Sequence, residues 1–142
     1  MKADEIKEAE KRALGRVGRL KPKFRYRGHA IPELKGTLKD RVAMHTRSIT
    51  EMKDFFDVID LIEFDVEGVK KEAIRFGYYI YEDGKLRWGS QTTLTEEKSI
   101  LLDLFRKAYE KPWFRELIDE CSTHETQKGL MRPLEYRDEA GY

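Results

Sequence analysis

The feature that most constrains the fold is a strict alternation of apolar and polar side chains in the middle of the chain. Its apolar positions are Ile62, Phe64, Val66, Ile74, Phe76, Tyr78 and Ile80. A period of two is that of an extended strand, and Asp83-Gly84 is a favoured two-residue hairpin turn. We therefore predict a three-stranded antiparallel meander over about residues 61–92, with strands at 61–67, 72–82 and 85–92. Its apolar face requires a helical cover.

The stretch before this meander has a different period, because its apolar side chains step alternately by four and by three residues. These side chains are Leu38, Val42, His45, Ile49, Met52, Phe56 and Ile59. Such a heptad pattern predicts one long helix over residues 37–60, with a seam that packs on another helix or on a second copy of the chain. A capping-box pattern at Ser48 and Glu51 leaves open a break into two helices near Thr46. On this seam, His45 is expected to be a hydrogen-bonded core residue.

Helical spacing also occurs near both ends of the chain, at residues 3–19, 95–110 and 112–121. Together these patterns predict an α+β fold with a helical N-terminal half, the antiparallel meander, and C-terminal helices packed on it. The length of 142 residues fits one domain, 1–142, with a basic N-terminal segment at 1–36 and a flexible tail at 122–142. A rival assignment places helices at 49–60 and 65–76 before a hairpin at 78–88, as in a winged helix. The strict alternation argues against it.

Charge is distributed unevenly, although the net charge is only +1. Residues 1–50 hold fourteen Lys/Arg against six Asp/Glu, a net +8, and residues 51–142 hold fourteen against twenty-one, a net −7. This asymmetry indicates a basic segment that meets nucleic acid or an acidic protein surface. The alternative is that the two halves neutralise each other within the fold.

Composition narrows the class of protein further. A single cysteine excludes an internal disulfide framework. The charged start lacks a secretory apolar core, and no apolar run approaches the length that spans a bilayer. We therefore expect a cytoplasmic protein with no membrane partner.

The segment from Leu20 to Arg27 is the strongest functional lead, because cations and apolar residues alternate along it. The candidate contacts for nucleic acid or an acidic partner are Lys21, Lys23, Phe24, Arg25, Tyr26 and Arg27. In an extended chain the four cations lie on one side at roughly 7 Å spacing, and the two aromatic rings can stack on bases. The alternative is an edge strand whose cations prevent aggregation.

Catalytic signals are weak. Asp65 and the Asp83-Gly84-Lys85 triplet fit the letters of a Mg²⁺-dependent nuclease motif, in which two carboxylates and a lysine surround the metal. The triplet is better explained by the hairpin turn. We expect no catalytic residues, no metal site and no cofactor, and the sequence favours a protein without enzyme activity.

The sequence thus predicts a non-catalytic binding or assembly module that uses its basic N-terminal segment on nucleic acid or an acidic protein partner. One alternative is a structural subunit, viral or complex-accessory, that forms a homo-oligomer through the 38–59 seam. A small Mg²⁺-dependent nuclease is the other alternative.

Overall fold

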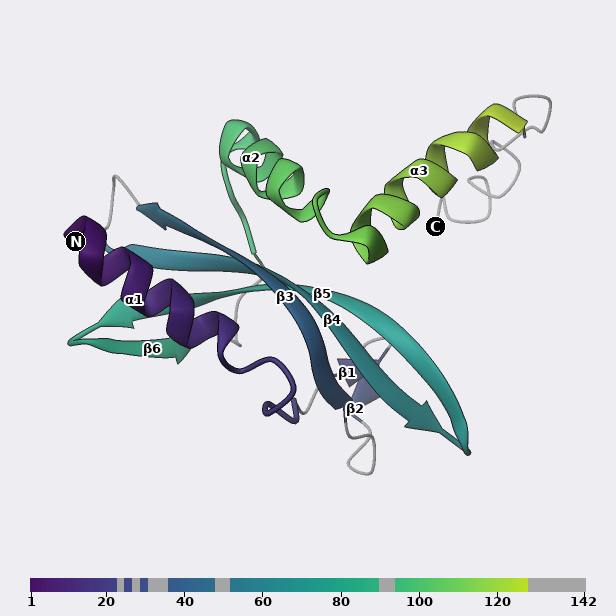
Figure 1. The fold of residues 1–142 in the computed structure, drawn as a ribbon, viewed down its shortest axis with the longest axis horizontal. Helices are drawn as coiled ribbons and strands as arrows, with labels where there is room; N and C mark the ends of the chain where they lie inside the picture. The colour runs from purple at the N-terminus through teal and green to yellow at the C-terminus, as the bar shows by residue number, and fades with distance from the viewer. Residues whose placement is uncertain (23–24, 27–28, 31–35, 48–51, 90–93, 128–142) are drawn as a thin grey trace, which may run out of the picture. The chain divides into compact units, whose positions relative to one another are not determined.

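The computed structural model describes residues 1–22, 25–26, 29–30, 36–47, 52–89 and 94–127. The chain divides into two compact units, Met1–Ala108 and Tyr109–Tyr142. The first unit contains helix α1 (Ala3–Leu14), a four-stranded sheet and helix α2 (Lys98–Ala108) (Figure 1). It also contains a small two-stranded sheet, in which β1 (Arg25–Tyr26) pairs with β2 (His29–Ala30).

The main sheet is fully antiparallel, with the strand order β3-β4-β5-β6. Its strands are β3 (Gly36–Arg47), β4 (Asp54–Val66), β5 (Val69–Glu82) and β6 (Lys85–Trp88). Two-residue turns at Glu67-Gly68 and Asp83-Gly84 have positive φ at both central positions, as a type I′ hairpin requires. The α+β class is therefore confirmed, and the sheet is antiparallel as predicted. It has four strands rather than three, because β3 joins it, and the predicted helical N-terminal half is wrong.

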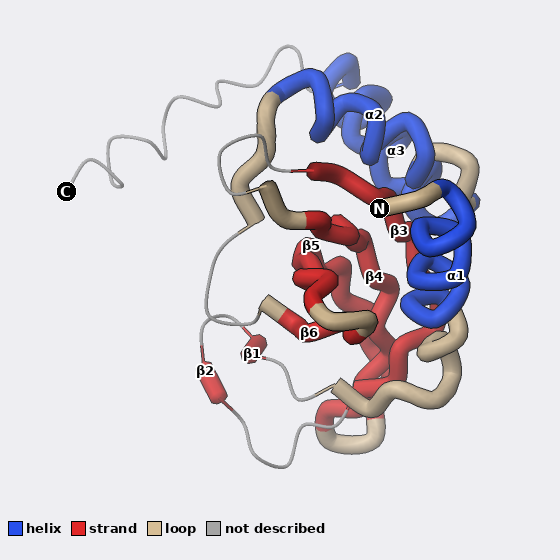
Figure 2. Tube along the Cα trace, turned by 90° about the vertical axis from the view of Figure 1, so that its left-hand side faces the viewer, coloured by secondary structure: helices blue, strands red, loops and turns tan. Residues whose placement is uncertain are grey.

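Helices cover both faces of this sheet. On one face, Ala9 and Ala13 of α1 pack against Phe56, Val58 and Tyr79, and all five are buried (Figure 2). Phe76 has the opposite parity to Tyr79 in the regular strand β5, so its side chain points to the other face. There it stacks on Phe105 of α2, with ring centroids 5.9 Å apart.

The predicted helix over residues 37–60 is wrong, because these residues belong to β3 and β4. The two strands pair with each other, from Gly36 opposite Phe64 to Arg47 opposite Asp54. The seam therefore does not exist as one helical face. Its members are distributed as follows: Leu38, Val42, Phe56 and Ile59 are buried in the sheet, His45 is half-buried, Met52 is exposed, and Ile49 lies outside the described residues. Since both faces of β4 are covered, its apolar residues need not alternate, which removed the usual strand signal. The winged-helix assignment fails for the same reason.

Other helix predictions have mixed outcomes. Within the described part of residues 1–60, α1 is the only helix, and it ends at Leu14 rather than at residue 19. The predicted C-terminal helices are present as α2 and as α3 (Pro112–Gln127), which begins at the predicted proline and continues past residue 121. Most of the predicted tail, 128–142, lies outside the described residues, and the single-domain assignment stays a prediction.

The second unit is described by α3 and the turn before it. Arg115 donates hydrogen bonds to the main-chain oxygens of Tyr109 (3.1 Å) and Glu110 (3.0 Å), which fixes the start of the helix. The Tyr109 hydroxyl donates to Asp119 at 2.6 Å, and this bond raises the pKa of Tyr109. None of the described helices is both long and apolar enough to span a bilayer.

Candidate functional site

Helix α1 concentrates positive charge at its C-terminal end. Its first turn carries Asp4 and Glu5, and its last turn carries Lys11 and Arg12. This order is favourable, because the dipole of a helix is positive at its N-terminus and negative at its C-terminus. Buried Ala9 and Ala13 hold the opposite side of the helix against the sheet, so the charged side faces solvent.

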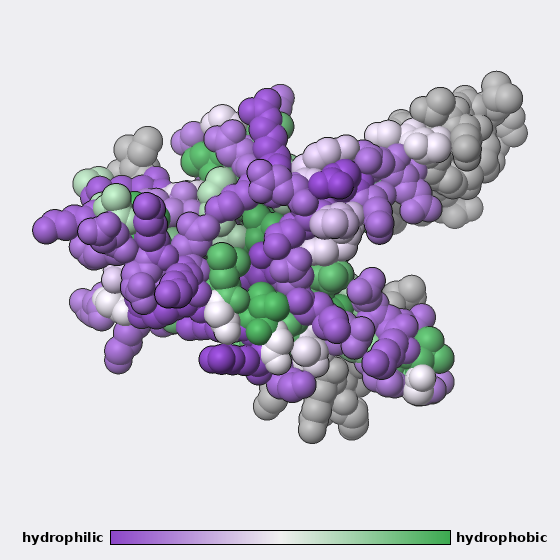
Figure 3. Space-filling model, viewed as in Figure 1, coloured by the Kyte–Doolittle hydropathy of each residue, from purple (hydrophilic) through white to green (hydrophobic). Residues whose placement is uncertain are grey.

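A shallow groove of about 480 Å³ lies along this charged side. We call it the basic groove, and it is lined by Glu8, Lys11, Arg12, Gly15, Arg16 and Arg19. Glu8, Lys11 and Arg12 lie in α1, and Gly15, Arg16 and Arg19 lie in the turns that directly follow it. The groove thus holds four cations and one carboxylate, on a side of the molecule whose visible surface over α1 is mainly hydrophilic (Figure 3).

The cations of the basic groove are held without acidic partners. Arg12 donates to the main-chain oxygen of Gly84 at 2.9 Å. The guanidinium carbon of Arg16 lies 4.6 Å from the ring centroid of Tyr79, within cation–π range. Neither these two side chains nor Lys11 and Arg19 form an ion pair with any carboxylate in the described part of the chain. Within the described part of the chain, no carboxylate therefore neutralises these four side chains.

A buried ionic network fastens the end of α1 to the sheet. Arg41 of β3 binds Asp60 of β4 through two parallel hydrogen bonds of 2.6 and 2.9 Å. Its remaining nitrogen donates to the Ala13 carbonyl oxygen (3.1 Å) and to the Tyr79 hydroxyl (2.8 Å). Burial opposes the charged form of Arg41, but the hydrogen bond and charge of Asp60 outweigh it and raise the pKa of Arg41. The last turn of α1 is thus tied to a permanently charged guanidinium.

The same carboxylate serves a second cation. Arg75 of β5 donates to Asp60 at 2.8 Å, and its guanidinium lies 4.4 Å from the centre of the Trp88 ring. Two guanidinium groups therefore share one carboxylate, which leaves an excess positive charge beneath the C-terminal end of α1.

The predicted binding segment is only partly described. Lys21 is exposed and donates to the Thr37 hydroxyl at 3.2 Å, not to a carboxylate. Main-chain bonds from Gly36 and Leu38 to this segment show that its start runs along β3. Arg25 and Tyr26 lie in β1, but their side chains, like Lys23, Phe24 and Arg27, fall outside the described residues. A role for these residues in binding stays a prediction.

The basic groove was not singled out from the sequence. Lys11, Arg12, Arg16 and Arg19 lie within nine residues of one another in the sequence, but their clustering was not predicted as a binding surface. What the spacing could not show is that no carboxylate of the sheet reaches them.

A second unusual group is the buried carboxyl of Asp57 in β4. Asp57 is 1% exposed, and its Oδ2 atom has no hydrogen-bond partner among the described residues. Burial, followed by the hydrogen bond and the charge of nearby Glu96, raises the pKa of Asp57 to about 9. Glu96, just before α2, also accepts a hydrogen bond from the Thr46 hydroxyl at 3.1 Å. Asp57 is therefore a neutral acid at pH 7.

His45 has a carboxylate partner in the neighbouring strand. Its Nε2 atom lies 2.8 Å from Oδ1 of Asp54, and its ring centroid lies 5.3 Å from that of Phe56. These contacts agree with a hydrogen-bonded core histidine, in a strand rather than on a helical seam.

The residues of the nuclease motif do not come together. Asp65 lies at the β4–β5 turn, where it accepts a hydrogen bond from the Gly68 nitrogen at 2.8 Å. Asp83 lies in the β5–β6 turn and Lys85 directly follows this turn, at the opposite end of β5. Nowhere in the described part of the chain do three or more His, Cys, Asp or Glu side chains form a group suited to a metal ion.

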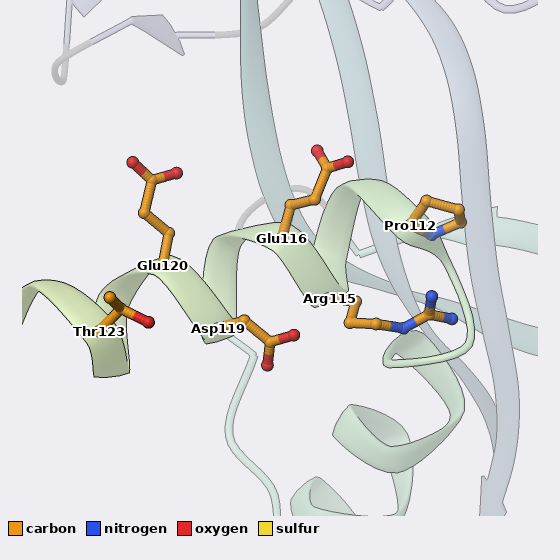
Figure 4. A pocket seen from close by; sticks show the side chains of 6 residues that line it. All are labelled: Pro112, Arg115, Glu116, Asp119, Glu120 and Thr123. Carbon is orange, nitrogen blue, oxygen red and sulfur yellow. The ribbon is translucent and has the colours of Figure 1, made fainter.

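Helix α3 carries a shallow depression lined by Pro112, Arg115, Glu116, Asp119, Glu120 and Thr123 (Figure 4). Glu116 and Glu120 extend to one side of the helix, whereas Asp119 and Arg115 extend to another. The carboxylates diverge, so this depression is not a ligand-binding arrangement.

Comparison with protein-family models, with curated proteins and with solved structures found no match to this chain.

Proposed function

We propose that the protein binds single-stranded nucleic acid through the basic groove and the segment that follows it. The observation that carries this proposal is the set of four groove cations that have no carboxylate partner in the part of the chain that the structure describes. Arginine predominates among them, and its planar guanidinium matches the geometry of phosphate oxygens. Arg19, the last cation of the groove, lies two residues before Lys21, the first cation of the predicted binding segment, so the two sets of cations are adjacent along the chain.

The groove is also preorganised. Contact with Tyr79 restrains Arg16, and a hydrogen bond to Gly84 restrains Arg12, so less side-chain entropy is lost when a phosphate binds. Lys11 and Arg19 are exposed and supply attraction without a structural role.

The experiment is a fluorescence anisotropy titration of a labelled single-stranded oligonucleotide at ~50 mM salt. The double variant Lys11→Ala/Arg19→Ala should weaken binding and lower the slope of log affinity against log salt by about 1.4, since each phosphate contact contributes about 0.7. The matched control Lys70→Ala/Lys71→Ala removes the same charge from β5 and should leave the slope unchanged.

Replacing Lys21, Lys23, Arg25 and Arg27 by Ala tests the adjoining segment and should abolish retention of the oligonucleotide while the fold survives. Equal affinity of the wild type and both groove and segment variants would exclude this function. Binding of an acidic protein domain, but of no oligonucleotide, would assign the groove to a protein partner instead.

A further inference from the structure

Among the described residues, the outer edge of β5 is unpaired over much of its length. Strand β6 has four residues and pairs with β5 only over Tyr79–Glu82, whereas β4 pairs with β5 from Val69 to Tyr81 (Figure 1). No main-chain hydrogen bond from outside β4 reaches residues 69–77 in the described structure. An unpaired edge of this kind can accept an additional strand.

Strand parity identifies the main-chain groups that face outward. The Gly89 nitrogen donates to the Tyr78 carbonyl oxygen at 3.0 Å, so the Tyr78 carbonyl points toward the β6 side. In antiparallel pairing, every second residue directs its N–H and C=O to the same side. The groups available to another strand therefore belong to Lys70, Glu72, Ile74 and Phe76.

At the opposite edge of the sheet, main-chain groups of β3 are hydrogen-bonded to other parts of the protein. The N-terminal part of β3 is bonded by Gly18, Leu20 and Pro22, and the Ala43 carbonyl oxygen accepts a hydrogen bond from the Lys107 ammonium at 2.6 Å. The free part of β5, by contrast, contains no proline and no register shift. Its regular backbone is thus suited to pairing.

Side chains along the open edge specify the chemistry of a partner. On the α2 face, Phe76 is 45% exposed, beside the partly buried Ile74. On the α1 face lie Lys71, which has no ion pair in the described structure, and Arg75, which shares Asp60 with Arg41. At Ile74 and Phe76 an added strand would meet apolar surface on the α2 face, where Lys70 and Glu72 continue the edge, and it would meet cations on the α1 face.

We propose that the open edge of β5, residues 69–77, binds an extended protein segment in which acidic and apolar residues alternate. The main-chain groups of the edge supply the hydrogen bonds of β-augmentation. Apolar residues of the partner cover Phe76 and Ile74, and its acidic residues pair with Arg75 and Lys71. This site is separate from the basic groove and does not depend on nucleic-acid binding.

The test uses the full chain and a fluorescein-labelled heptapeptide of alternating valine and aspartate, capped at both ends. The peptide should bind and should protect the amides of residues 70–76 from hydrogen exchange. A peptide with lysine in place of aspartate should bind more weakly.

Glu72→Pro is the decisive variant. The main-chain N–H of Glu72 points away from β4, so its removal leaves the pairing of β4 with β5 intact. Loss of one edge donor and the bulk of the ring should weaken binding about tenfold. Glu72→Ala is the matched control, which retains the N–H and removes an anion, so it should bind the peptide equally or more tightly. Lys71→Glu tests the charge contribution without altering the backbone and should also weaken binding.

Three results would each overturn the proposal. One is equal binding by wild type, folded Glu72→Pro and Lys71→Glu. Another is protection by the peptide at α1 but not at β5. The third is a dimer of the free protein in sedimentation that Glu72→Pro abolishes, which would assign the edge to a second copy of this chain.

Discussion

Replacing Asp57 by Asn should stabilise the protein, although the side chain is almost fully buried in the sheet. In the folded protein the pKa of Asp57 is raised to about 9, from an ordinary value of 3.8. The folded state therefore binds a proton that the unfolded chain has lost at neutral pH. The contribution of Asp57 to the free energy of unfolding is therefore largest below about pH 4 and decreases as the pH rises toward 9.

The magnitude follows from the same two values. At pH 7 the unfolded chain has lost the proton of Asp57, whose ordinary pKa of 3.8 lies 3.2 pH units lower. Keeping this group protonated in the folded protein costs 1.36 kcal/mol for each of these units, or about 4 kcal/mol. Asn carries no charge and its amide can donate to Glu96, so Asp57→Asn should recover up to this amount. Its advantage over the wild type should grow by about 1.4 kcal/mol per pH unit between pH 4 and 9.

The assay is urea unfolding of both proteins at unit steps from pH 4 to pH 9. A matched control is Asp65→Asn, which changes an exposed carboxylate at the end of the same strand and should show no such slope. A variant Asp57→Asn that is less stable than wild type at pH 8, or a difference independent of pH, would refute the reasoning.

Two further substitutions test the packing that positions the candidate site. Arg41→Met should lower the free energy of unfolding by about 3 kcal/mol, because it leaves the Asp60 carboxylate buried with one cation instead of two. Urea unfolding measures this loss, and a loss below 1 kcal/mol would contradict the prediction. Gly77→Ala should cost about 1–3 kcal/mol, because a Cβ at this position would overlap the Trp88 ring. Thermal unfolding should show a lowered midpoint, and an unchanged midpoint would mean that the ring moves freely.

The meander could be predicted because its signals are local. Alternation of apolar side chains over 74–80 and the Asp83-Gly84 turn both act within a few residues, and the structure confirms β5, the turn and β6. The Glu67-Gly68 turn also has a local signal in the sequence, because Gly68 readily adopts one of the two positive φ values that the turn needs.

The first hairpin was mistaken for a helix because of its buried acids. Asp54, Asp57 and Asp60 recur every third residue in β4, which imitates the polar side of an amphipathic helix. In the structure Asp57 and Asp60 are buried, on opposite faces of the strand, and each is stabilised by a long-range partner. Those partners, Glu96 and Arg41, are distant in sequence. No local pattern could therefore have revealed that these acids belong to a strand.

The uneven charge of the two halves can now be divided into a compensated and an uncompensated part. Cations of β3 form ion pairs with acidic residues from the second half of the chain: Arg41 binds Asp60, and Lys39 lies 4.0 Å from Glu63. Among the described residues, the cations of the basic groove have no such partner, and the buried carboxylate of Asp60 already binds two guanidinium groups. Our proposal is that an external anion neutralises the charge of the basic groove. If that reasoning holds, raising the salt concentration should weaken polyanion binding strongly while changing the stability of the fold far less, because buried pairs are little screened.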